Sequence, residues 1–419
     1  MKDLRTIILA AGKGTRMKSG TPKVLHTVCG KALIDYVVHV AEAVGSLKIY
    51  AVLGHQLDVV KAHLGTRSVV VEQKELLGTA DAVRRCAKVL AEYSGDVLVL
   101  CGDTVLLRQE SVRQLLNKHR RSNAACTVMT VDVADPFGYG RIIRAQGQML
   151  AIREEKDASP AEKEVREINV GVYCFNSKLL FSFLKAVKLN VRKREFYLTD
   201  VVELLVNEGE KVETLKIADA NEGEGINDRE ELAFAAAVIR ERILKDLMAS
   251  GVTVIDPKTT HVSADAKIGQ DTVLQPFTVI ENNVQVGRNC VIGPFAHLRP
   301  GTRLADQVQI GNFAEVSRTR MGSNSLMKHF SFVGDAIVGK NVNIGAGTVT
   351  ANYDGKNKNQ TVIADRAFIG SDSILVAPVT VGRGSITGAG CVVKKGTVVP
   401  AGKIAVGVPA RILDKKRKF

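Results

Sequence analysis

A glycine-rich loop with basic side chains follows the first apolar run of the chain. The apolar residues Ile7–Ala10 lead directly into the sequence AGKGTR (residues 11–16), and Lys23 follows a proline a few positions later. A turn of this kind after a strand presents backbone N–H groups to an anion. Because Arg16 and Lys23 add positive charge beside the turn, the pattern predicts a site for phosphate groups.

The spacing of this loop separates it from two common phosphate-binding motifs. It lacks the G-x-x-x-x-G-K-[ST] spacing of a Walker loop, and Met17 stands where the third glycine of G-x-G-x-x-G would be. It matches instead the pattern L-A-A-G-x-G-T-R-M, followed by Pro22-Lys23. In this the chain resembles sugar-phosphate nucleotidylyltransferases, and the resemblance implies transfer of a nucleotidyl group to a sugar phosphate.

Two oxygen-bearing side chains could hold a divalent cation near such a loop. Asp103 comes just after the apolar run VLVLCG (97–102), where ligands of open sheets bind. A buried carboxylate needs a partner, and Mg²⁺ would supply one. Asn227, in the stretch EGIND (224–228), offers a second oxygen. The two residues are therefore a candidate metal site.

The first part of the chain predicts the scaffold for these residues. Up to about residue 227, short β-branched runs such as IYAVLG (49–54) alternate with helical patterns such as 33–45 and 80–92. Alternation of this kind predicts a Rossmann-like α/β domain, a mostly parallel sheet with helices on both faces. Residues 228–250 then form one amphipathic helical pattern, with Asp228 as its N-cap and Gly251 as its end.

Beyond residue 250 the aliphatic residues recur every six positions. The period runs from Ile268 to Val316 without a miss, returns at Phe332, Val338 and Ile344, and runs again from Ile363 to Val381. Hexads predict short strands, three to a coil, in a β-solenoid. The pattern resembles the left-handed parallel β-helix of hexapeptide-repeat acyltransferases. Two interruptions, at about 317–331 and 351–362, are expected to be loops that carry function.

Composition narrows the class of protein. The chain has 419 residues, a net charge of +14, no Trp and only 5% aromatic residues. Positive charge suits phosphates, whereas the lack of aromatic residues argues against a nucleic-acid stacking surface. Seven cysteines without a C-x-x-C pair indicate neither a zinc site nor a disulfide framework. With no signal peptide or membrane-spanning run, we expect a cytoplasmic enzyme without membrane insertion.

Taken together, nearly the whole chain resembles the GlmU family of bacterial bifunctional uridyltransferases and acetyltransferases, which join the two halves in this order. The stretches GYGRI (138–142), EEKDA (154–158) and EINVGVY (167–173) also match the family. The resemblance implies UTP, acetyl-CoA, glucosamine-1-phosphate and N-acetylglucosamine-1-phosphate as small-molecule substrates, Mg²⁺ as cofactor and a homotrimer. We expect a nucleotidylyltransferase domain at 1–227, a helical linker at 228–250, a β-helix acetyltransferase domain at 251–408 and a basic tail at 409–419.

The resemblance assigns residues to the first site one by one. Arg16 and Lys23 would hold the phosphates as catalytic cations, and Asp103 and Asn227 would hold Mg²⁺. The uridine nucleotide would be bound by Leu9, Ala10, Ala11, Gly12, Lys23, Gln73, Gly78, Thr79 and Asn227, and the amino sugar by Gly140, Glu154 and Asn169. Leu76 and Cys101 stand where the family commonly has Gln and Tyr. Neither change removes a charge or a metal ligand.

The resemblance also assigns a second site in the β-helix. His329, which falls in the first interruption, would be the general base, and Glu315 in GNFAEV (311–316) would orient it. The remaining candidates divide into two groups. The acetyl-acceptor sugar phosphate would be bound by Arg299, Asn343, Asn352, Tyr353 and Lys358. Acetyl-CoA would lie against Ala346, Ser371 and Ala389.

Three positions of the second site depart from the family. Ser317 replaces a phosphate-binding lysine, Phe332 replaces a sugar-contacting tyrosine, and Gly407 replaces a coenzyme-contacting arginine. Arg318 is adjacent to Ser317, but strand alternation predicts that its side chain points to the other face. Two outcomes follow from the loss of this phosphate cation: a high KM for glucosamine-1-phosphate if the cation matters, or tight binding if Arg299 and Lys358 suffice.

Two further readings of the sequence stay open. The chain could be a single-activity sugar-1-phosphate nucleotidylyltransferase whose β-helix is an oligomerisation scaffold. It could also be a non-catalytic regulatory subunit built on the same domains, although such a chain need not keep the phosphate loop. Gly12, Gly14, Arg16, Lys23 and Asp103 are all present, which argues against a regulatory subunit.

Overall fold

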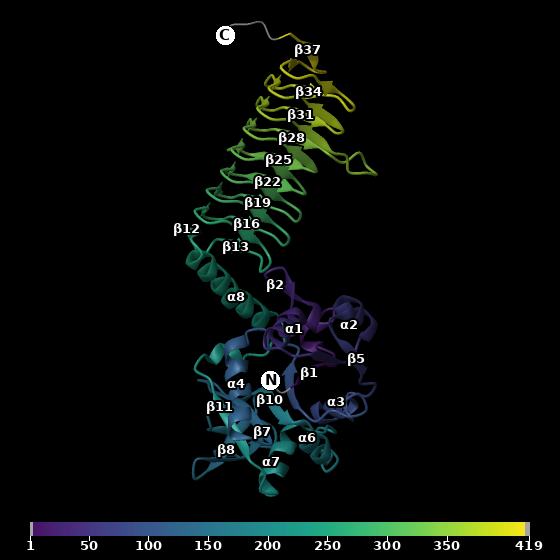
Figure 1. Cartoon of the computed structure of the whole chain (residues 1–419), viewed down its shortest axis with the longest axis vertical. Coiled ribbons are helices and arrows are strands. Elements are labelled where there is room, and N and C mark those ends of the chain that lie inside the picture. Colours follow the sequence, from purple (N-terminus) through teal and green to yellow (C-terminus); the bar gives the residue numbers. More distant parts are fainter. Residues whose placement is uncertain (1–2, 415–419) are drawn as a thin grey trace. The chain divides into compact units, whose positions relative to one another are not determined.

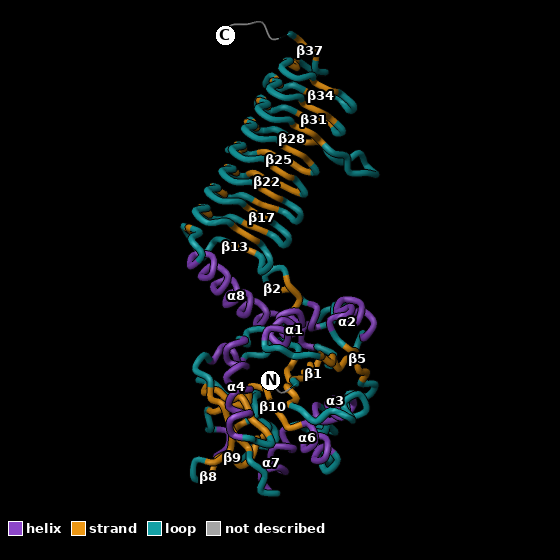
Figure 2. Tube along the Cα trace, in the orientation of Figure 1, coloured by secondary structure: helices purple, strands orange, loops and turns teal. Residues whose placement is uncertain are grey.

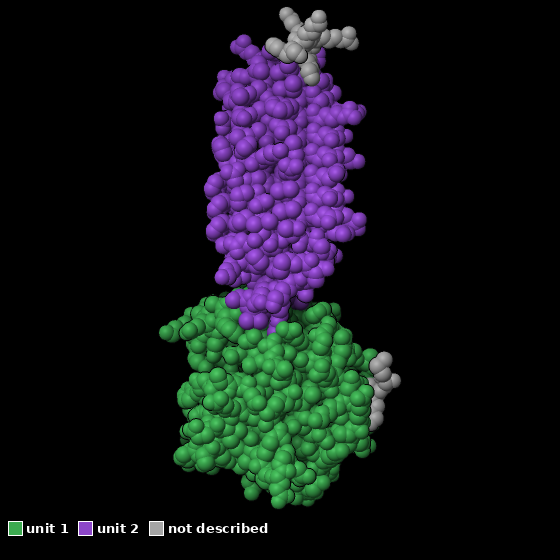
Figure 3. All heavy atoms as spheres, turned by 90° about the vertical axis from the view of Figure 1, so that its left-hand side faces the viewer, with its two compact units in different colours: residues 1–28, 32–236 green, residues 29–31, 237–419 purple. Residues whose placement is uncertain are grey.

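The computed structural model describes residues 3–414, and the KKRKF stretch of the predicted basic tail (415–419) lies outside the described residues. The described chain separates into two compact units, residues 1–28 with 32–236 and residues 29–31 with 237–419 (Figure 3). Their border falls inside one long helix, α8 (Arg229–Ala249). The hairpin tip at residues 29–31 groups with the second unit, which the sequence did not predict.

The first unit is built on a mixed but mostly parallel sheet (Figure 1). Its strand order is β11-β7-β10-β6-β1-β4-β5, and the hairpin β8–β9 joins it through β10. Strand β10 runs antiparallel to β6 and β7, whereas the β1 pairs with β4 and β6 are parallel. The strands are β1 (Leu4–Ala10), β4 (Lys48–Leu53), β5 (Val69–Glu72), β6 (Asp96–Cys101), β7 (Cys126–Asp132), β8 (Arg141–Ala145), β9 (Gln148–Arg153), β10 (Glu167–Asn176) and β11 (Val212–Lys216).

Helices cover both faces of this sheet because neighbouring apolar residues of a strand face opposite sides. Ile8 belongs to the core cluster that contains α1 and α4 side chains, and Ile7 belongs to the cluster that contains those of α3, α6 and α7. The predicted α/β domain is thus confirmed. Its helices are α1 (Leu33–Ala43), α2 (Leu57–Leu64), α3 (Thr79–Arg85), α4 (Gln109–Ser122), α5 (Pro160–Lys163), α6 (Ser177–Leu184) and α7 (Thr199–Asn207), and β2 (Thr27–Val28) pairs with β3 (Lys31–Ala32) outside the main sheet.

Helix α8 begins and ends where its sequence predicts. The carboxylate of Asp228 accepts hydrogen bonds from the backbone N–H groups of Glu230 and Glu231, each at 3.0 Å. This satisfies two of the donors that a helix leaves free at its N-terminus. Gly251, just past the helix, has φ +92°, a conformation that a side chain would strain.

The second unit is the predicted left-handed parallel β-helix, whose strands stack into three sheets (Figure 2). The first sheet contains β12 (Thr253–Val254), β15 (Val273–Leu274), β18 (Val291–Ile292), β21 (Gln309–Ile310), β24 (Leu326–Met327), β27 (Asn343–Ile344), β30 (Phe368–Ile369), β33 (Ile386–Thr387), β36 (Ile404–Val406) and β37 (Arg411–Leu413). The second contains β13 (His261–Val262), β16 (Val279–Ile280), β19 (His297–Leu298), β22 (Ala314–Ser317), β25 (Ser331–Gly334), β28 (Val349–Ala351), β31 (Ile374–Val376) and β34 (Val392–Val393). The third contains β14 (Lys267–Ile268), β17 (Gln285–Val286), β20 (Arg303–Leu304), β23 (Arg320–Met321), β26 (Ala336–Val338), β29 (Thr361–Ile363), β32 (Val379–Val381) and β35 (Val398–Val399).

The first predicted interruption of the repeat is wrong. Strands β23, β24 and β25 continue the coils through residues 317–331, so no loop is inserted there. The buried hydrophobic residues that continue the repeat here are Val316, Met321, Met327 and Val333, and the step from Val316 to Met321 is five residues instead of six. Val333 therefore faces the core, and Phe332, which the hexad pattern placed there, is partly exposed on the outer surface.

The second predicted interruption is a projecting loop between β28 and β29 (Figure 2). Asp354 organises it: its carboxylate accepts backbone N–H groups of Lys356 at 3.1 Å and Asn357 at 2.8 Å, and the ammonium of Lys395 at 3.2 Å. These bonds hold the pKa of Asp354 well below its usual range. The loop is therefore stabilised by hydrogen bonds among its own residues and by the ion pair with Lys395 of a neighbouring coil.

Candidate active sites

A cleft of about 500 Å³ opens at the carboxyl ends of β1 and β6 in the first unit. It is lined by the glycine-rich loop together with residues from several parts of the sheet edge. Leu76 and Cys101, the two departures from the family, lie in the same wall. Of the residues predicted for the first site, the cleft contains Leu9, Ala10, Ala11, Gly12, Lys23, Gln73, Gly78, Thr79 and Asp103.

Two glycines shape the cleft because no side chain fits where they lie. Gly14 has φ +61°, and a Cβ there would lie 2.6 Å from the Cβ of Lys23. Gly78, before helix α3, has φ +99°, and a Cβ there would lie 2.5 Å from the carbonyl oxygen of Phe196. The first glycine lets Lys23 cross close over the loop, and the second lets the chain at residue 196 close one side of the cleft.

Lys23 joins the two predicted metal ligands. Its ammonium Nζ lies 2.5 Å from Oδ2 of Asp103 and 3.2 Å from Oδ1 of Asn227. The two oxygens therefore converge on one point that already holds a positive charge. Carboxylate and amide oxygens suit Mg²⁺, which usually takes one or two protein ligands and completes its shell with phosphate and water. These residues fit such a cation.

The three residues predicted to hold the amino sugar form a separate cluster. The backbone N–H of Asn169 donates to the carbonyl of Gly140 at 2.8 Å, and a Cβ at Gly140 would lie 3.6 Å from Oε1 of Glu154. Glu154 accepts from the hydroxyl of Thr199 at 3.0 Å. Burial raises the pKa of Glu154, and the bond from Thr199 opposes this shift in part.

Arg16 differs from the other predicted cations of this site. Its side chain is exposed, and no residue of the described range 3–414 hydrogen-bonds to it or forms an ion pair with it. Lys23, in contrast, is held by Asp103 and Asn227. Arg16 therefore keeps its donors for an incoming anion, as does the exposed Lys13 of the same loop, which lines the cleft.

Sequence reasoning missed the residue that fixes Gln73. The side chain of Gln73 is 3% exposed, and its Nε2 donates to Oδ2 of Asp81 at 2.9 Å and to the carbonyl of Gly78 at 3.0 Å. Both donor hydrogens of the amide are thereby used, so its oxygen is left for a ligand. A buried acid in the first turn of α3 was the available signal. Glu195, a further residue of the cleft wall, was not among the predicted site residues, although it begins the stretch EFYLTD (195–200), which also resembles the family.

The candidates for the second site lie at two corners of the β-helix coils. We call the turns from the first sheet to the second the histidine corner (residues 328–330, 345–348, 370–373 and 388–391). It contains His329, Ala346, Ser371 and Ala389 on four successive coils. The predicted base and the predicted acetyl-CoA residues are thus stacked along one edge.

The turns from the second sheet to the third contain most of the acceptor-binding candidates. We call them the cation corner (residues 299–302, 318–319, 335 and 352–360). Arg299, Asn352, Tyr353 and Lys358 lie there, and an isolated bridge pairs Tyr353 with Lys358. Asn343, in contrast, lies on β27 of the first sheet. One chain therefore does not bring all five acceptor-binding candidates together.

Glu315 does not contact His329 in this structure. It lies on β22, and its Oε1 accepts from Nη1 of Arg299 at 2.9 Å. The ring of His329 is exposed, and within residues 3–414 it has no hydrogen-bond partner. The expected carboxylate–imidazole pair is thus absent from this arrangement, and Glu315 holds a candidate phosphate cation instead.

The expected direction of the Arg318 side chain is wrong. Strand β22 ends at Ser317, and Arg318 has φ +47°, so strand alternation no longer applies to it. Its guanidinium folds back over Ser317, where Nη1 donates to the serine Oγ at 2.8 Å. A cation therefore lies at the position where the sequence had indicated that one was lost.

The two other departures in this unit are small local changes. Phe332 packs on the outer surface of β25, between Glu315 and Val349 on the neighbouring strands. Its ring would touch a Cβ at Gly334, at 2.7 Å. Gly407 follows β36 with φ +87°, a conformation that suits glycine better than the arginine it replaces.

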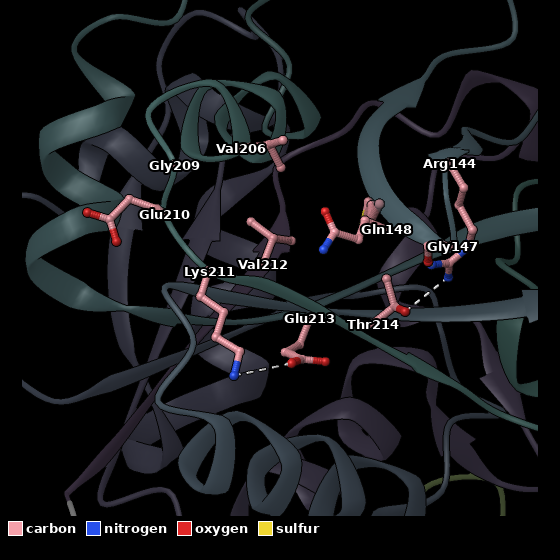
Figure 4. Close-up of a pocket in the computed structure, with 11 residues that line it drawn as sticks. Arg144, Gly147, Gln148, Val206, Gly209, Glu210, Lys211, Val212, Glu213 and Thr214 are labelled. Atoms are coloured by element: carbon pink, nitrogen blue, oxygen red, sulfur yellow. Dashed lines mark hydrogen bonds and ion pairs between the residues drawn. The ribbon is translucent and has the colours of Figure 1, made fainter.

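A second pocket of the first unit, about 480 Å³, lies between the β8–β9 hairpin and β11 (Figure 4). Three of its charged residues are paired: Arg144 pairs with Glu167, outside the lining, at 2.6 Å and donates to Thr214 at 3.0 Å, and Lys211 lies 3.6 Å from Glu213. Across the described chain, no cluster of three or more His, Cys, Asp or Glu residues suits a metal ion. No described helix has the length and apolar character needed to cross a membrane.

Comparison with known proteins agrees with both halves of the chain. Residues 5–220 match the nucleotidyl transferase family, and residues 265–300, 283–318 and 360–395 match the bacterial transferase hexapeptide family. Among solved structures, a putative glucose-1-phosphate thymidylyltransferase from Bacillus anthracis is 20% identical with a TM-score of 0.48, and the match covers 57% of this chain and 96% of that one.

Curated relatives match almost the full length of the chain. The bifunctional protein GlmU of Pelotomaculum thermopropionicum is 44% identical, over 90% of this chain and 90% of the relative. GlmU of a Geobacillus strain is 44% identical over 92% and 91%, and that of Bacillus subtilis is 43% identical over 96% and 95%.

Fold and sites together define a nucleotidyltransferase joined to a hexapeptide-repeat acyltransferase, a multifunctional transferase. Within that class, the chain belongs to the GlmU family of bifunctional enzymes. The resemblance drawn from the sequence motifs is thereby confirmed.

Proposed function

We propose that the chain makes UDP-N-acetylglucosamine in two steps, one at each site. The β-helix would transfer the acetyl group of acetyl-CoA to glucosamine-1-phosphate. The α/β unit would then transfer uridylyl from UTP to N-acetylglucosamine-1-phosphate and release pyrophosphate. The observation that carries the proposal is that the cleft of the first unit gathers the phosphate loop, Lys23 and Asp103 in one chain whose relatives are bifunctional.

In the uridylyl step, a phosphate oxygen of the sugar phosphate attacks the α-phosphorus of UTP as the α–β bridging bond breaks. The loop fixes the geometry, and Arg16 and Lys23 neutralise charge that develops on the phosphates. Gln73 directs its amide oxygen toward the base because Asp81 takes one of its N–H groups. A Mg²⁺ ion held by Asp103 and Asn227 would add charge neutralisation when bound.

In the acetyl step, the sugar amine attacks the thioester carbonyl, the C–S bond breaks and coenzyme A leaves as a thiol. His329 would take the proton that the amine loses and pass it to the departing sulfur, so that coenzyme A leaves as the thiol. Glu315, by holding Arg299, supports placement of the sugar phosphate. Arg299, Asn343, Asn352, Tyr353 and Lys358 would hold the acceptor.

A split assay tests the two activities separately. Pyrophosphate release is measured with UTP and N-acetylglucosamine-1-phosphate, and thiol release with acetyl-CoA and glucosamine-1-phosphate. We expect both, the first dependent on Mg²⁺. Pyrophosphate release without any thiol release would contradict the second activity and leave the β-helix as a scaffold.

The buried carboxyl of Glu154 predicts that binding of N-acetylglucosamine-1-phosphate weakens at acidic pH, which would appear as an acid limb in the pH profile of the uridylyl reaction. Because its pKa is raised, a larger fraction is protonated at mildly acidic pH than for an exposed glutamate, and the protonated form loses an acceptor for sugar hydroxyls. We expect the KM for N-acetylglucosamine-1-phosphate to rise as pH falls toward that raised pKa. In Glu154→Gln the KM should be high throughout and should lose this component of the pH profile.

The control for this pH profile must account for the other charged groups near Glu154. Asp157 and Glu195 raise the pKa of Glu154, Lys193 lowers it, and burial raises the pKa of nearby Asp200 to about 6. The exposed Glu164→Gln serves as the matched control and should keep the wild-type profile. A Glu154→Gln enzyme with an unchanged acid limb would assign the limb to Asp200 and contradict the prediction.

We further propose a cytoplasmic homotrimer, assembled through the β-helix. Phe277, Phe295 and Phe313 stack along one edge, with ring centroids 4.7 and 5.0 Å apart, and all three are exposed. The separation of Asn343 from the cation corner also favours a second site that a neighbouring chain completes. Light scattering should report three chain masses at assay concentration.

A charged substitution on that edge should separate the two activities. Phe313→Glu is expected to weaken the assembly and lower thiol release at least about tenfold, with pyrophosphate release unchanged, because a buried unpaired carboxylate destabilises an apolar interface. Phe137→Glu, at an exposed phenylalanine of the first unit, is the control. A stable wild-type monomer that releases thiol would refute the trimer.

A further inference from the structure

The donors of Arg318 can be counted atom by atom. Its Nε lies 2.6 Å from Oδ1 of Asp335, its Nη2 lies 2.9 Å from Oδ2 of Asp335, and its Nη1 lies 2.8 Å from Oγ of Ser317. A guanidinium has five N–H groups, so two remain after these three bonds. The side chain is 38% exposed, so the remaining donors are within reach of a ligand.

The position of Arg318 in the cation corner is fixed by its neighbours. Its backbone N–H donates to the carbonyl of Pro300 at 3.3 Å, directly after Arg299 on the previous coil. Asp335, on the next coil, donates its own N–H to the carbonyl of Ser317 at 2.9 Å. Arg318 thus lies in register between Arg299 and Asp335.

Asp335 links Arg318 to the far side of the corner. Its carboxylate also accepts the side-chain amide of Asn352, and Lys358 acts on it through charge. Arg318 and Asn352 hold the pKa of Asp335 below its usual range, so this carboxyl is ionised at neutral pH. An ionised carboxylate at this corner would repel a phosphate dianion unless a cation covers it.

We propose that Arg318 donates to the phosphate of the acetyl-acceptor sugar, together with Arg299 and Lys358. It supplies the cation that Ser317 lacks, and it does so from the neighbouring position because the chain enters the left-handed conformation after β22. Asp335 is a positioning residue that holds the planar guanidinium with its two remaining N–H groups outward. The inference rests on the proposed acetyl transfer and deepens it by naming a third phosphate ligand.

The test measures the KM for glucosamine-1-phosphate in thiol release. Arg318→Ala should raise this KM at least about tenfold, since a charge-assisted hydrogen bond to phosphate is lost, and leave the KM for acetyl-CoA unchanged. Arg318→Lys should recover part of the loss. The control is Arg320→Ala, which removes the same charge from an exposed residue of β23 in the third sheet.

A second variant separates direct donation from simple neutralisation of Asp335. In the double variant Arg318→Ala/Asp335→Asn the repelling carboxylate is gone, and the oxygen of the introduced amide can still accept from Asn352. If Arg318 donates to phosphate, the double variant stays at least about fivefold weaker than wild type in this KM. If the KM returns to the wild-type value, Arg318 is only a counter-ion and the inference is overturned.

Failure of the inference and failure of the proposed function give different results. An active wild type with an Arg318→Ala variant that behaves like Arg320→Ala overturns the role of Arg318 alone. A wild type that releases no thiol while it still releases pyrophosphate overturns the acetyl transfer and the inference with it. An unchanged KM for acetyl-CoA reports that the β-helix of each variant is folded, and pyrophosphate release reports the same for the α/β unit.

Discussion

Asp103→Ala should abolish uridylyl transfer, with a loss of about a thousandfold or more in kcat, and leave thiol release at the wild-type rate. The substitution removes the carboxylate whose Oδ2 lies 2.5 Å from Lys23 and with it one of two protein oxygens for the divalent cation. Lys23 would then keep only the amide of Asn227 among these partners. Pyrophosphate release is the measurement, with Mg²⁺ varied at fixed UTP.

The control for this loss is Asp58→Ala, because Asp58 is an exposed acid in the first turn of α2 and lies outside the cleft. It should keep both activities. An Asp103→Ala chain that remains folded but loses thiol release as well would refute two independent sites. One that retains more than a tenth of pyrophosphate release would show that Asp103 is not a ligand of the required metal.

The first site was largely predictable because its elements are local and strongly patterned. Four apolar residues followed by AGKGTR (11–16) define a strand and its loop, and the run before Asp103 defines the next strand. Parallel strands end at one sheet edge, so residues far apart in sequence had to meet there. The sequence pattern did not predict the hydrogen bond between Gln73 and Asp81, because a buried acid at the start of a helix has many possible partners.

In the β-helix, the six-residue period led to one wrong prediction, the loop at 317–331. A coil shortened by one residue keeps its strands, but every later core position shifts by one. A strict six-residue pattern therefore fails at the shortened turns, and the failure looks like an inserted loop. Val333, and not Phe332, then faces the core. The inserted loop at 352–360 was found correctly because so long a stretch cannot be absorbed in a turn, whereas one missing residue can.

Side-chain direction at the cation corner was beyond a pattern-based argument. Alternation holds only inside a strand, and the prediction for Arg318 failed because β22 ends one residue earlier. The same limit explains Glu315, which pairs across the coils with Arg299 and not with His329. In both cases the deciding partner lies one coil away, 17 residues along the chain for Arg318 and 16 for Glu315, where no local spacing rule applies.

His329→Ala should lower the kcat of thiol release by about a hundredfold or more, with pyrophosphate release unchanged. The imidazole is the proposed acceptor of the amine proton, and alanine leaves that proton to water. The ring is exposed and has no hydrogen-bond partner within residues 3–414, so its removal costs the coil little stability. Both KM values should change much less than kcat, since the base acts in the chemical step and the cation corner holds the acceptor.

The matched control is His261→Ala on β13, a histidine of the same β-helix whose ring lies 3.4 Å from Arg240. It should keep the wild-type kcat in both assays. A His329→Ala enzyme with a normal kcat would refute the general-base assignment, and a raised KM for glucosamine-1-phosphate with unchanged kcat would make His329 a binding residue instead. Because Arg318→Ala is expected to raise that KM and spare kcat, the two variants together separate proton transfer at the histidine corner from phosphate binding at the cation corner.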